Sequence, residues 1–516
     1  MDDKKISIEI TPVKYQPENQ IDATEEFNQI LTLVTLGTCL LIGVVGTFLF
    51  DGKAWGLNMS LFGLLLAGSL LLLRNLGQDP LNVVEYMLVA SGLFFTVALA
   101  WRDSLVLNSL SLLGILLTIN LAFTLGTRQR LQEFHVYEAF EDLYASSKYG
   151  FISYYDLINQ DIQWKMLRQR WGEYGRATLK GLIITVPLII LFGILFTASD
   201  ARFEDMVEQL FDWGWNEKIV VEYILAFVIS SWIAVAVLRG GVLKQGLNVK
   251  EEHITPPPSW TLGSIEIVMI LGALNILFLS FIAVQFTYFF GGDALVQSAQ
   301  GPTYANYARR GFEELVTVAV LVITLLLLTH WLQSYTELEK RLYQILAVIM
   351  VLMTMVIEAS AAHRMYLYTR EYGLTELRFY TSVFMVWLIV LFIWFILTVL
   401  REKRARFTFG AILTGMVFIG LLHFINPDAR IAQINLARLQ AGQTLDADYV
   451  SALSADTVPS LLAVLPALPE SERCKLWASL RSHKVLHTSD EWRNFNLARA
   501  QARDLLLSVT TPSNCQ

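Results

Sequence analysis

Long apolar stretches with almost no charges recur along this chain, and they constrain its fold more than any other feature. A helix needs about 20 mostly apolar residues to cross the hydrocarbon core of a bilayer, because every backbone polar group there must be bonded within the helix. The sequence therefore predicts an all-α polytopic transmembrane helical bundle of about 11 spans. The predicted spans are residues 31–50, 54–73, 83–101, 105–125, 179–197, 219–238, 264–290, 315–333, 342–362, 379–400 and 407–425.

The composition agrees with this class and excludes others. Only 16% of the residues are charged, whereas soluble domains carry about 25%. The formal net charge of −7 gives no reason to expect a nucleic-acid partner, because nucleic-acid binding normally requires a strongly basic surface. The first 30 residues are polar and mixed in charge, and they lack the basic start and small-residue cleavage site of a removable signal peptide. The first span is therefore expected to be uncleaved.

The distribution of Lys and Arg predicts the orientation. If the amino terminus is cytoplasmic, the inner segments hold more than twice as many of these residues as the outer loops, as the positive-inside rule requires. This predicts a multi-pass protein of a bacterial-type inner membrane. The predicted segments are a cytoplasmic amino-terminal segment (1–30), a four-span region (31–125), a cytoplasmic helical loop (126–178), a seven-span region (179–425) and an extracytoplasmic helical domain (426–516).

The carboxyl-terminal domain is predicted to be a small helical bundle. Asn426 can act as an N-cap and Pro427 suits the first helical position. Short helices are predicted at residues 428–442, 446–453, 459–465 and 470–480, and a longer one at 490–507. In an oxidising compartment Cys474 and Cys515 could form a disulfide, although two cysteines can also remain free.

Six short motifs occur in a fixed order along the chain: residues 196–203, 307–315, 372–378, 426–430, 445–449 and 453–459. The set resembles the bacterial membrane family known as domain of unknown function 4173, with its near relative 4153 as the alternative. The resemblance covers residues 179 to 459. It implies a multi-pass membrane protein without an established activity, so it supplies no catalytic residue. In the predicted topology all six motifs lie on the outer face.

Ionisable residues also gather on this predicted outer face. Glu358 falls in the outer half of its predicted span, and an ionisable side chain inside a membrane segment is a functional candidate by default. Glu358, His363 and His423 could hold a metal, but a structural polar cluster with Arg364 is the simpler interpretation, so no metal ligand is assigned. Asp200 is a candidate carboxylate, but its position fits a helix N-cap better. The candidate binding residues are Asp200, Arg202, Arg309, Arg310, Glu358, His363, Arg364 and Arg378.

The sequence contains no nucleotide-binding loop, zinc-protease motif or nucleophile elbow. No catalytic residue and no cofactor can therefore be assigned. The leading hypothesis is a non-enzymatic membrane protein that binds a ligand, a lipid or an envelope protein at its outer face, with the lipid bilayer as its surroundings. The first alternative is a transporter of a small solute. The second is an envelope enzyme that uses Glu358, His363 and Asp200 in acid–base roles.

Overall fold

The computed structural model is built from helices, with no β-strand among the residues that it describes. Those residues are 23–50, 54–127, 136–164, 217–243, 261–290, 312–332, 337–401, 405–443, 446–487 and 491–509, with scattered positions between 178 and 203. This confirms the predicted all-α class.

Ten of the described helices are long and apolar enough to cross a membrane, so the chain is a multi-pass membrane protein. Each coincides with a predicted span, whereas the predicted span at 179–197 lies outside the described residues apart from scattered positions. The ten are α1 (Ala23–Phe50), α2 (Leu57–Leu76), α3 (Val83–Trp101), α4 (Leu105–Thr127), α8 (Glu217–Leu238), α9 (Ser264–Phe290), α12 (Phe312–Leu332), α13 (Glu337–Tyr372), α14 (Glu376–Thr398) and α15 (Ala405–Ile425).

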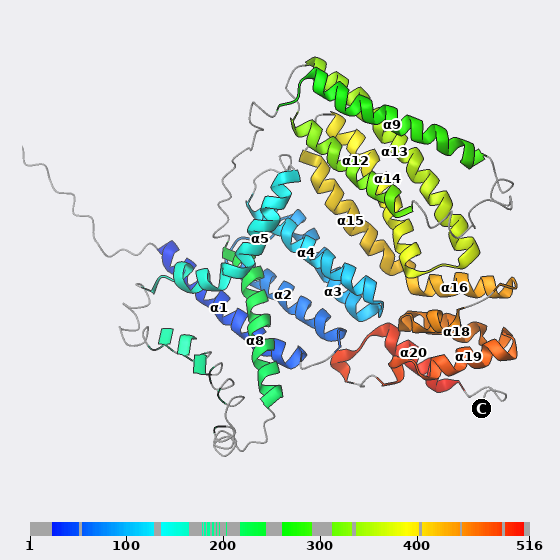
Figure 1. Ribbon diagram of the computed structural model, residues 1–516. Helices are drawn as coiled ribbons and strands as arrows, with labels where there is room; N and C mark the ends of the chain where they lie inside the picture. The colour runs from blue at the N-terminus through cyan, green and yellow to red at the C-terminus, as the bar shows by residue number, and fades with distance from the viewer. Residues whose placement is uncertain are drawn as a thin grey trace, which may run out of the picture.

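The helices form two groups that meet along α15 (Figure 1). The first group contains α1–α4, α8 and the shorter helix α5 (Val136–Asp156), and its core includes Ile42, Phe62 and Ala234. The second contains α9 and α12–α15, with Tyr343 and Phe392 in its core. A smaller cluster, including Phe95 from α3 and Met416 from α15, joins the two groups.

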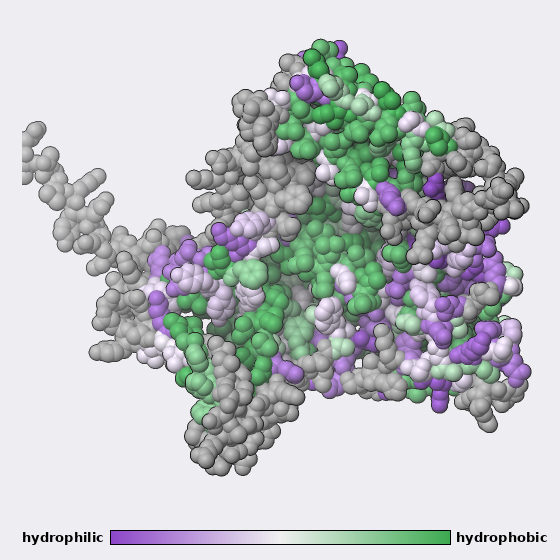
Figure 2. Space-filling view, viewed as in Figure 1, coloured by the Kyte–Doolittle hydropathy of each residue, from purple (hydrophilic) through white to green (hydrophobic). Residues whose placement is uncertain are grey.

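Apolar side chains also cover much of the outside of the bundle (Figure 2). On α9, Ile267 and Leu271 are fully buried, while Met269 and Ile276 are 67% and 71% exposed. Exposed apolar faces of this kind are expected where lipid is the surrounding solvent. The carboxyl-terminal part of the chain has a much more hydrophilic surface (Figure 2).

A buried ion-pair cluster closes one end of the first group. Here α5 and α8 continue into the π-helical turns η2 (Leu157–Asp161) and η3 (Arg239–Leu243). The Arg239 side chain is 1% exposed and donates to Asp161 Oδ2 at 2.5 Å and to Asp156 Oδ2 at 3.3 Å. Its guanidinium group also lies over the Tyr149 ring. Asp156 and Asp161 belong to the predicted cytoplasmic loop (126–178), so these ion pairs attach that loop to the bundle.

At the opposite end, residues 426–509 form a compact helical layer, which we call the tail (Figure 1). Its elements are α16 (Pro427–Gln440), α17 (Ala447–Ala452), η6 (Ala455–Thr457), α18 (Val458–Val464), η7 (Leu465–Ala467), α19 (Glu470–Arg481), η8 (Lys484–His487), η9 (Trp492–Asn494) and α20 (Leu497–Ser508). Its own core includes Leu461, Leu476 and Trp477.

Local sequence patterns predicted the positions of most of these helices correctly. The Asn426 side chain accepts from Ala429 N with Pro427 directly after it, which confirms the predicted cap. The helix predicted at 490–507 was too long. It begins only at Leu497, because the Asn496 side chain accepts from Arg499 N and thereby starts a new helix.

Candidate functional site at the junction of bundle and tail

A buried polar junction joins the tail to the bundle, and Asp456 lies at its centre. The Asp456 side chain is 1% exposed, and its Oδ1 lies 3.0 Å from Arg102 Nη1. Its Oδ2 accepts from Asp103 N at 2.9 Å. Arg102 also donates through Nε to the His423 carbonyl at 2.9 Å. The turn between α3 and α4 is therefore bonded at once to the tail and to the end of α15.

A second ion pair fixes α20 to the same turn. Arg499 Nη1 lies 3.2 Å from Asp103 Oδ1, and Asp103 Oδ2 accepts from Ala455 N at 3.3 Å. Arg499 Nη2 also donates to the Trp55 carbonyl at 2.6 Å. Asn496 donates to the Leu99 carbonyl at 3.0 Å. The tail thus contacts both the α1–α2 and the α3–α4 connections.

The second helix group is held through the turn between α13 and α14. Leu374 and Asn435 exchange two hydrogen bonds, of 2.9 and 2.7 Å. Gly373 has a φ of +80°, and a Cβ there would collide with the side chains of Asn435 and Arg438. Glu376 N donates to the Tyr449 hydroxyl at 2.8 Å. The tail therefore bridges turns of both helix groups at one end of the bundle.

Asp428 lies beside this network, and it has no ion-pair partner among the residues that the structure describes. It occupies the first turn of α16, is 1% exposed, and accepts from Ser454 Oγ at 2.5 Å through Oδ2. Its Oδ1 has no hydrogen-bond partner among the described residues. Burial raises the pKa of the Asp428 carboxyl, and the charge of Asp456 raises it further.

His423 completes the junction from the end of α15. It is fully buried, with Nε2 2.9 Å from Ser111 Oγ and Nδ1 3.0 Å from the Ile419 carbonyl. Both ring nitrogens thus lie at hydrogen-bonding distance from protein oxygens. Within the described part of the chain, no three His, Cys, Asp or Glu side chains are arranged to hold a metal ion.

The candidate residues on α13 and α14 lie in different surroundings. Glu358 is 2% exposed, and neither of its carboxylate oxygens has a hydrogen-bond partner among the described residues. His363 is exposed on the same helix, whereas Arg364 is buried. Arg378 closes the α13–α14 turn by donating to the Gly373 carbonyl at 2.5 Å, and it lies 3.9 Å from the Tyr368 ring centroid. Arg378 therefore has a structural role in this turn.

The remaining candidates lie outside the described residues: Asp200, Arg202, Arg309, Arg310 and Cys515. The Cys474–Cys515 pairing stays a prediction, while Cys39 is free and buried in α1.

The residues that make the junction are not among the candidates predicted from the sequence. Asp428, Ser454 and Asp456 all belong to two of the ordered motifs, 426–430 and 453–459. The order of the two motifs along the chain does not show that they contact each other or the α3–α4 turn. Asp103 and Arg499 lie outside those motifs, and no local pattern marks them.

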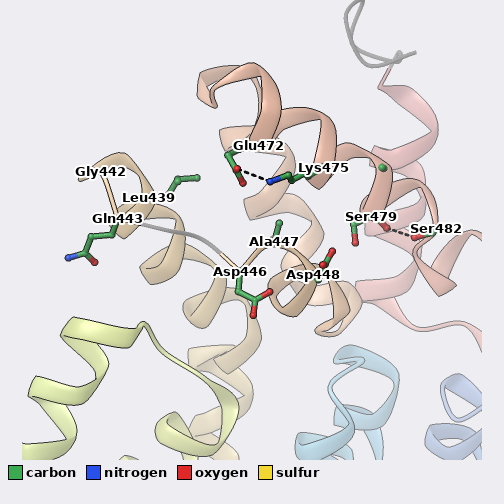
Figure 3. Close-up of a pocket in the computed structure, with 11 residues that line it drawn as sticks. Leu439, Gly442, Gln443, Asp446, Ala447, Asp448, Glu472, Lys475, Ser479 and Ser482 are labelled. Carbon is green, nitrogen blue, oxygen red and sulfur yellow. Dashed lines mark hydrogen bonds and ion pairs between the residues drawn. The ribbon is translucent and has the colours of Figure 1, made fainter. Parts of the chain in front are cut away.

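The tail also carries a groove of about 890 Å³ between α16, α17 and α19 (Figure 3). Glu472 and Lys475 form an ion pair of 3.3 Å on one wall, and Asp446 and Asp448 lie at the start of α17. Ser479 and Ser482 line the α19 side. The groove is lined by the tail alone and combines charges of both signs with small polar groups.

Comparison with known proteins gives a family but no activity. Residues 88–464 match the model of a domain of unknown function, DUF4153. No curated protein and no solved structure matches the chain. The match selects the alternative of the two families that the motifs resemble and replaces the first expectation, DUF4173. It runs from α3 to α18 and so includes Arg102, Asp103, Asp428 and Asp456. Because it covers most of the chain, the protein belongs to the DUF4153 family of membrane proteins.

Proposed function

We propose that this membrane protein binds an envelope partner through the face that its tail forms. The observation that supports this most is the junction, in which the tail is bonded to turns of both helix groups through the buried side chains of Asp456 and Asn435. A tail held in this way presents its surface in a fixed orientation to the bundle. Binding surfaces that are ordered before binding lose less conformational entropy when the partner docks.

The groove on the tail supplies a surface for such a partner. It lies in the hydrophilic part of the molecule, and its charged residues of both signs suit a polar protein segment or a polar headgroup. In the orientation predicted by the positive-inside rule, this face is extracytoplasmic. The partner would then be a component of the cell envelope.

A photocrosslinking amino acid at Ser482 in the full chain, expressed in its native membranes, tests this proposal. Ser482 lines the groove, whereas Gln501 is exposed on α20 outside it and provides the matched control position. We expect a discrete crosslinked product from position 482 and none from position 501. Lys475→Glu should reduce that product without unfolding the tail, because surface pairs contribute about 0–1 kcal/mol. Equal products from both positions, or no product from either, would refute the proposal.

A second candidate function is transport of a small solute, which the environment of Glu358 favours. Its side chain is almost completely buried in α13, which packs against α9, α12 and α14. Burying a carboxyl group without a hydrogen-bond partner inside a helix bundle destabilises the folded state, so a structural role alone does not explain it. Such groups often mark ion or proton pathways in transporters.

Flux measurements in proteoliposomes distinguish this function from partner binding. A transported solute should dissipate an imposed proton gradient in wild type and in Glu371→Gln, which removes an exposed carboxyl group from the same helix. It should fail to do so in Glu358→Gln. Flux that is equal in both variants would exclude a role for Glu358. The acid–base alternative has less support, because Glu358 is buried while His363 is exposed on the same helix.

A further inference from the structure

Three exposed apolar side chains of the tail lie close together in sequence, in and directly after η9. Trp492, Phe495 and Leu497 are 52%, 46% and 39% exposed. We call residues 491–497 the η9 segment. The other exposed large apolar side chains of the described tail lie on α16 and on the last two turns of α20. On a surface that is otherwise hydrophilic (Figure 2), neighbouring exposed apolar side chains usually mark a contact site.

The η9 segment is bonded to the ends of two membrane-spanning helices. Arg493 Nη1 donates at 2.6 Å to the carbonyl of Phe48, which lies in the last turn of α1. Leu57 N, at the start of α2, donates to the Phe495 carbonyl at 2.8 Å. The Trp492 and Phe48 rings are neighbours, with centroids 6.1 Å apart. These contacts fix the segment at the ends of α1 and α2 (Figure 1).

Phe48 also ends a strip of exposed apolar side chains along α1. Leu41, Val44 and Phe48 are 67%, 58% and 57% exposed, and their spacing of three and four residues places them on one face of the helix. Exposed apolar faces on membrane-spanning helices are expected where lipid is the surrounding solvent. Because the Trp492 ring lies against the last side chain of this strip, the apolar surface of the η9 segment continues the lipid-facing surface of α1.

Aromatic side chains mark the level of the membrane–water interface at this end of the bundle. Trp101 ends α3, and its ring centroid lies 5.2 Å from that of Phe424, which is 64% exposed near the end of α15. Trp55, between α1 and α2, is 42% exposed. Aromatic rings with a polar edge are enriched at this level, where one part of the ring meets apolar chains and the other meets water. Trp492, beside the last turn of α1, lies at the same level.

The charges within the η9 segment compensate each other, so they do not oppose contact with lipid. Arg493 Nη2 lies 2.8 Å from Glu491 Oε2, and the Arg493 side chain is only 14% exposed. Its guanidinium group also lies over the Phe48 ring, 5.0 Å from the centroid. Because the pair carries no net charge, the segment suits a zwitterionic headgroup and does not require an anionic one.

We propose that Trp492, Phe495 and Leu497 form a membrane anchor with which the tail binds the phospholipid headgroup region of the bilayer. Lipid is the occupant because the patch continues the lipid-facing strip of α1 and lies at the level of the interfacial aromatic residues. The anchor lies on other elements than the groove, so it does not depend on the partner proposed above. It attaches the tail to the bilayer as well as to the bundle.

Site-specific photocrosslinking in nanodiscs of phosphatidylcholine tests the anchor. A diazirine analogue of phenylalanine replaces Phe495 in the full chain and, in the control, Ser471, which is exposed on α19 far from α1 and α2 (Figure 1). The analogue keeps the aromatic ring of Phe495, so the fold should be preserved. We expect phosphatidylcholine adducts at position 495 and none at position 471. An adduct with a second protein chain in place of lipid, equal lipid adducts at both positions, or no adduct at 495 would overturn the proposal.

Quenching of tryptophan fluorescence by brominated phosphatidylcholine provides a second measurement without a crosslinker. Trp492→Phe keeps an aromatic ring, and the difference between its emission and that of wild type isolates the emission of Trp492. Bromine atoms near the glycerol end of the acyl chains should quench this emission more than bromine atoms near the chain terminus. Trp477→Phe, which removes an indole that is 3% exposed in the tail core, provides the control. Quenching no stronger for Trp492 than for Trp477 would overturn the anchor.

Discussion

Replacing Arg102 by methionine tests whether its buried ion pair with Asp456 holds the tail on the bundle. The two side chains are 15% and 1% exposed, and the charged atoms lie 3.0 Å apart. Methionine keeps an aliphatic chain in the same space but leaves the Asp456 carboxylate buried without its cation. Removal of one partner from a buried pair typically costs about 3–5 kcal/mol.

The expected cost at this site is lower, because other groups still donate to Asp456. Asp103 N and Asn426 Nδ2 lie 2.9 and 3.2 Å from its oxygens. We call the state in which the tail has separated from the bundle the open state. We therefore expect Arg102→Met to lower the free energy of opening by about 2–3 kcal/mol. This corresponds to a roughly 30- to 150-fold increase in the equilibrium constant for opening.

Amide hydrogen exchange of α16 to α18, measured by mass spectrometry in detergent micelles, reports this equilibrium directly. Asp456→Asn and the double variant complete a cycle, in which the double variant should cost about 1–2 kcal/mol less than the sum of the single variants. Lys475→Met is the control, since it removes an exposed pair and should leave exchange unchanged. Exchange within threefold of wild type in Arg102→Met, or additive effects in the cycle, would refute the reasoning.

Three further predictions concern the tail. Gly373→Ala should speed amide hydrogen exchange at the start of α16 about tenfold or more, because alanine combines left-handed backbone strain of about 1–2 kcal/mol with a collision of its Cβ with Asn435 and Arg438. Gly442→Ala, at a similar φ with open space around it, should show the effect of strain alone. The unfolding temperature should fall as pH rises from the ordinary pKa of an aspartate to the raised pKa of Asp428, since the folded state favours its protonated form; a flat profile in wild type, or an unchanged one in Asp428→Asn, would contradict this. Peptide mapping without reductant should find Cys474 linked to Cys515, and alkylation of both thiols would disprove the pairing.

The helices were predictable because their signals are local. A span must contain about 20 apolar residues whatever it packs against, so the ten described spans coincide with predicted ones. Capping is similarly local. At the start of α14, for example, Thr375 accepts from Arg378 N, only three residues away. A helix end depends on a few neighbouring residues, and the sequence contains all of them.

The junction was not predictable because its contacts are distant in sequence. Asp103 and Arg499 are 396 positions apart, and Arg102 and Asp456 are 354 apart. Taken alone, each of these residues resembles an ordinary charged residue in a loop between helices. Only the packing of the tail across the bundle buries them and makes their pairing necessary. The same holds for Arg239 and Asp161, which a packed α5 brings together.

Buried charges lie at the two ends of this molecule, and this placement follows from the cost of charge in hydrocarbon. Arg239 is neutralised by Asp161 at one end and Arg102 by Asp456 at the other. Between them, buried polar groups such as the hydroxyls of Thr354 and Tyr343 bond to nearby backbone carbonyls. Glu358 departs from this pattern, because neither of its carboxylate oxygens has a hydrogen-bond partner among the described residues. Stability alone does not explain such a group, so Glu358 is the residue at which a transported proton or solute is most reasonably sought.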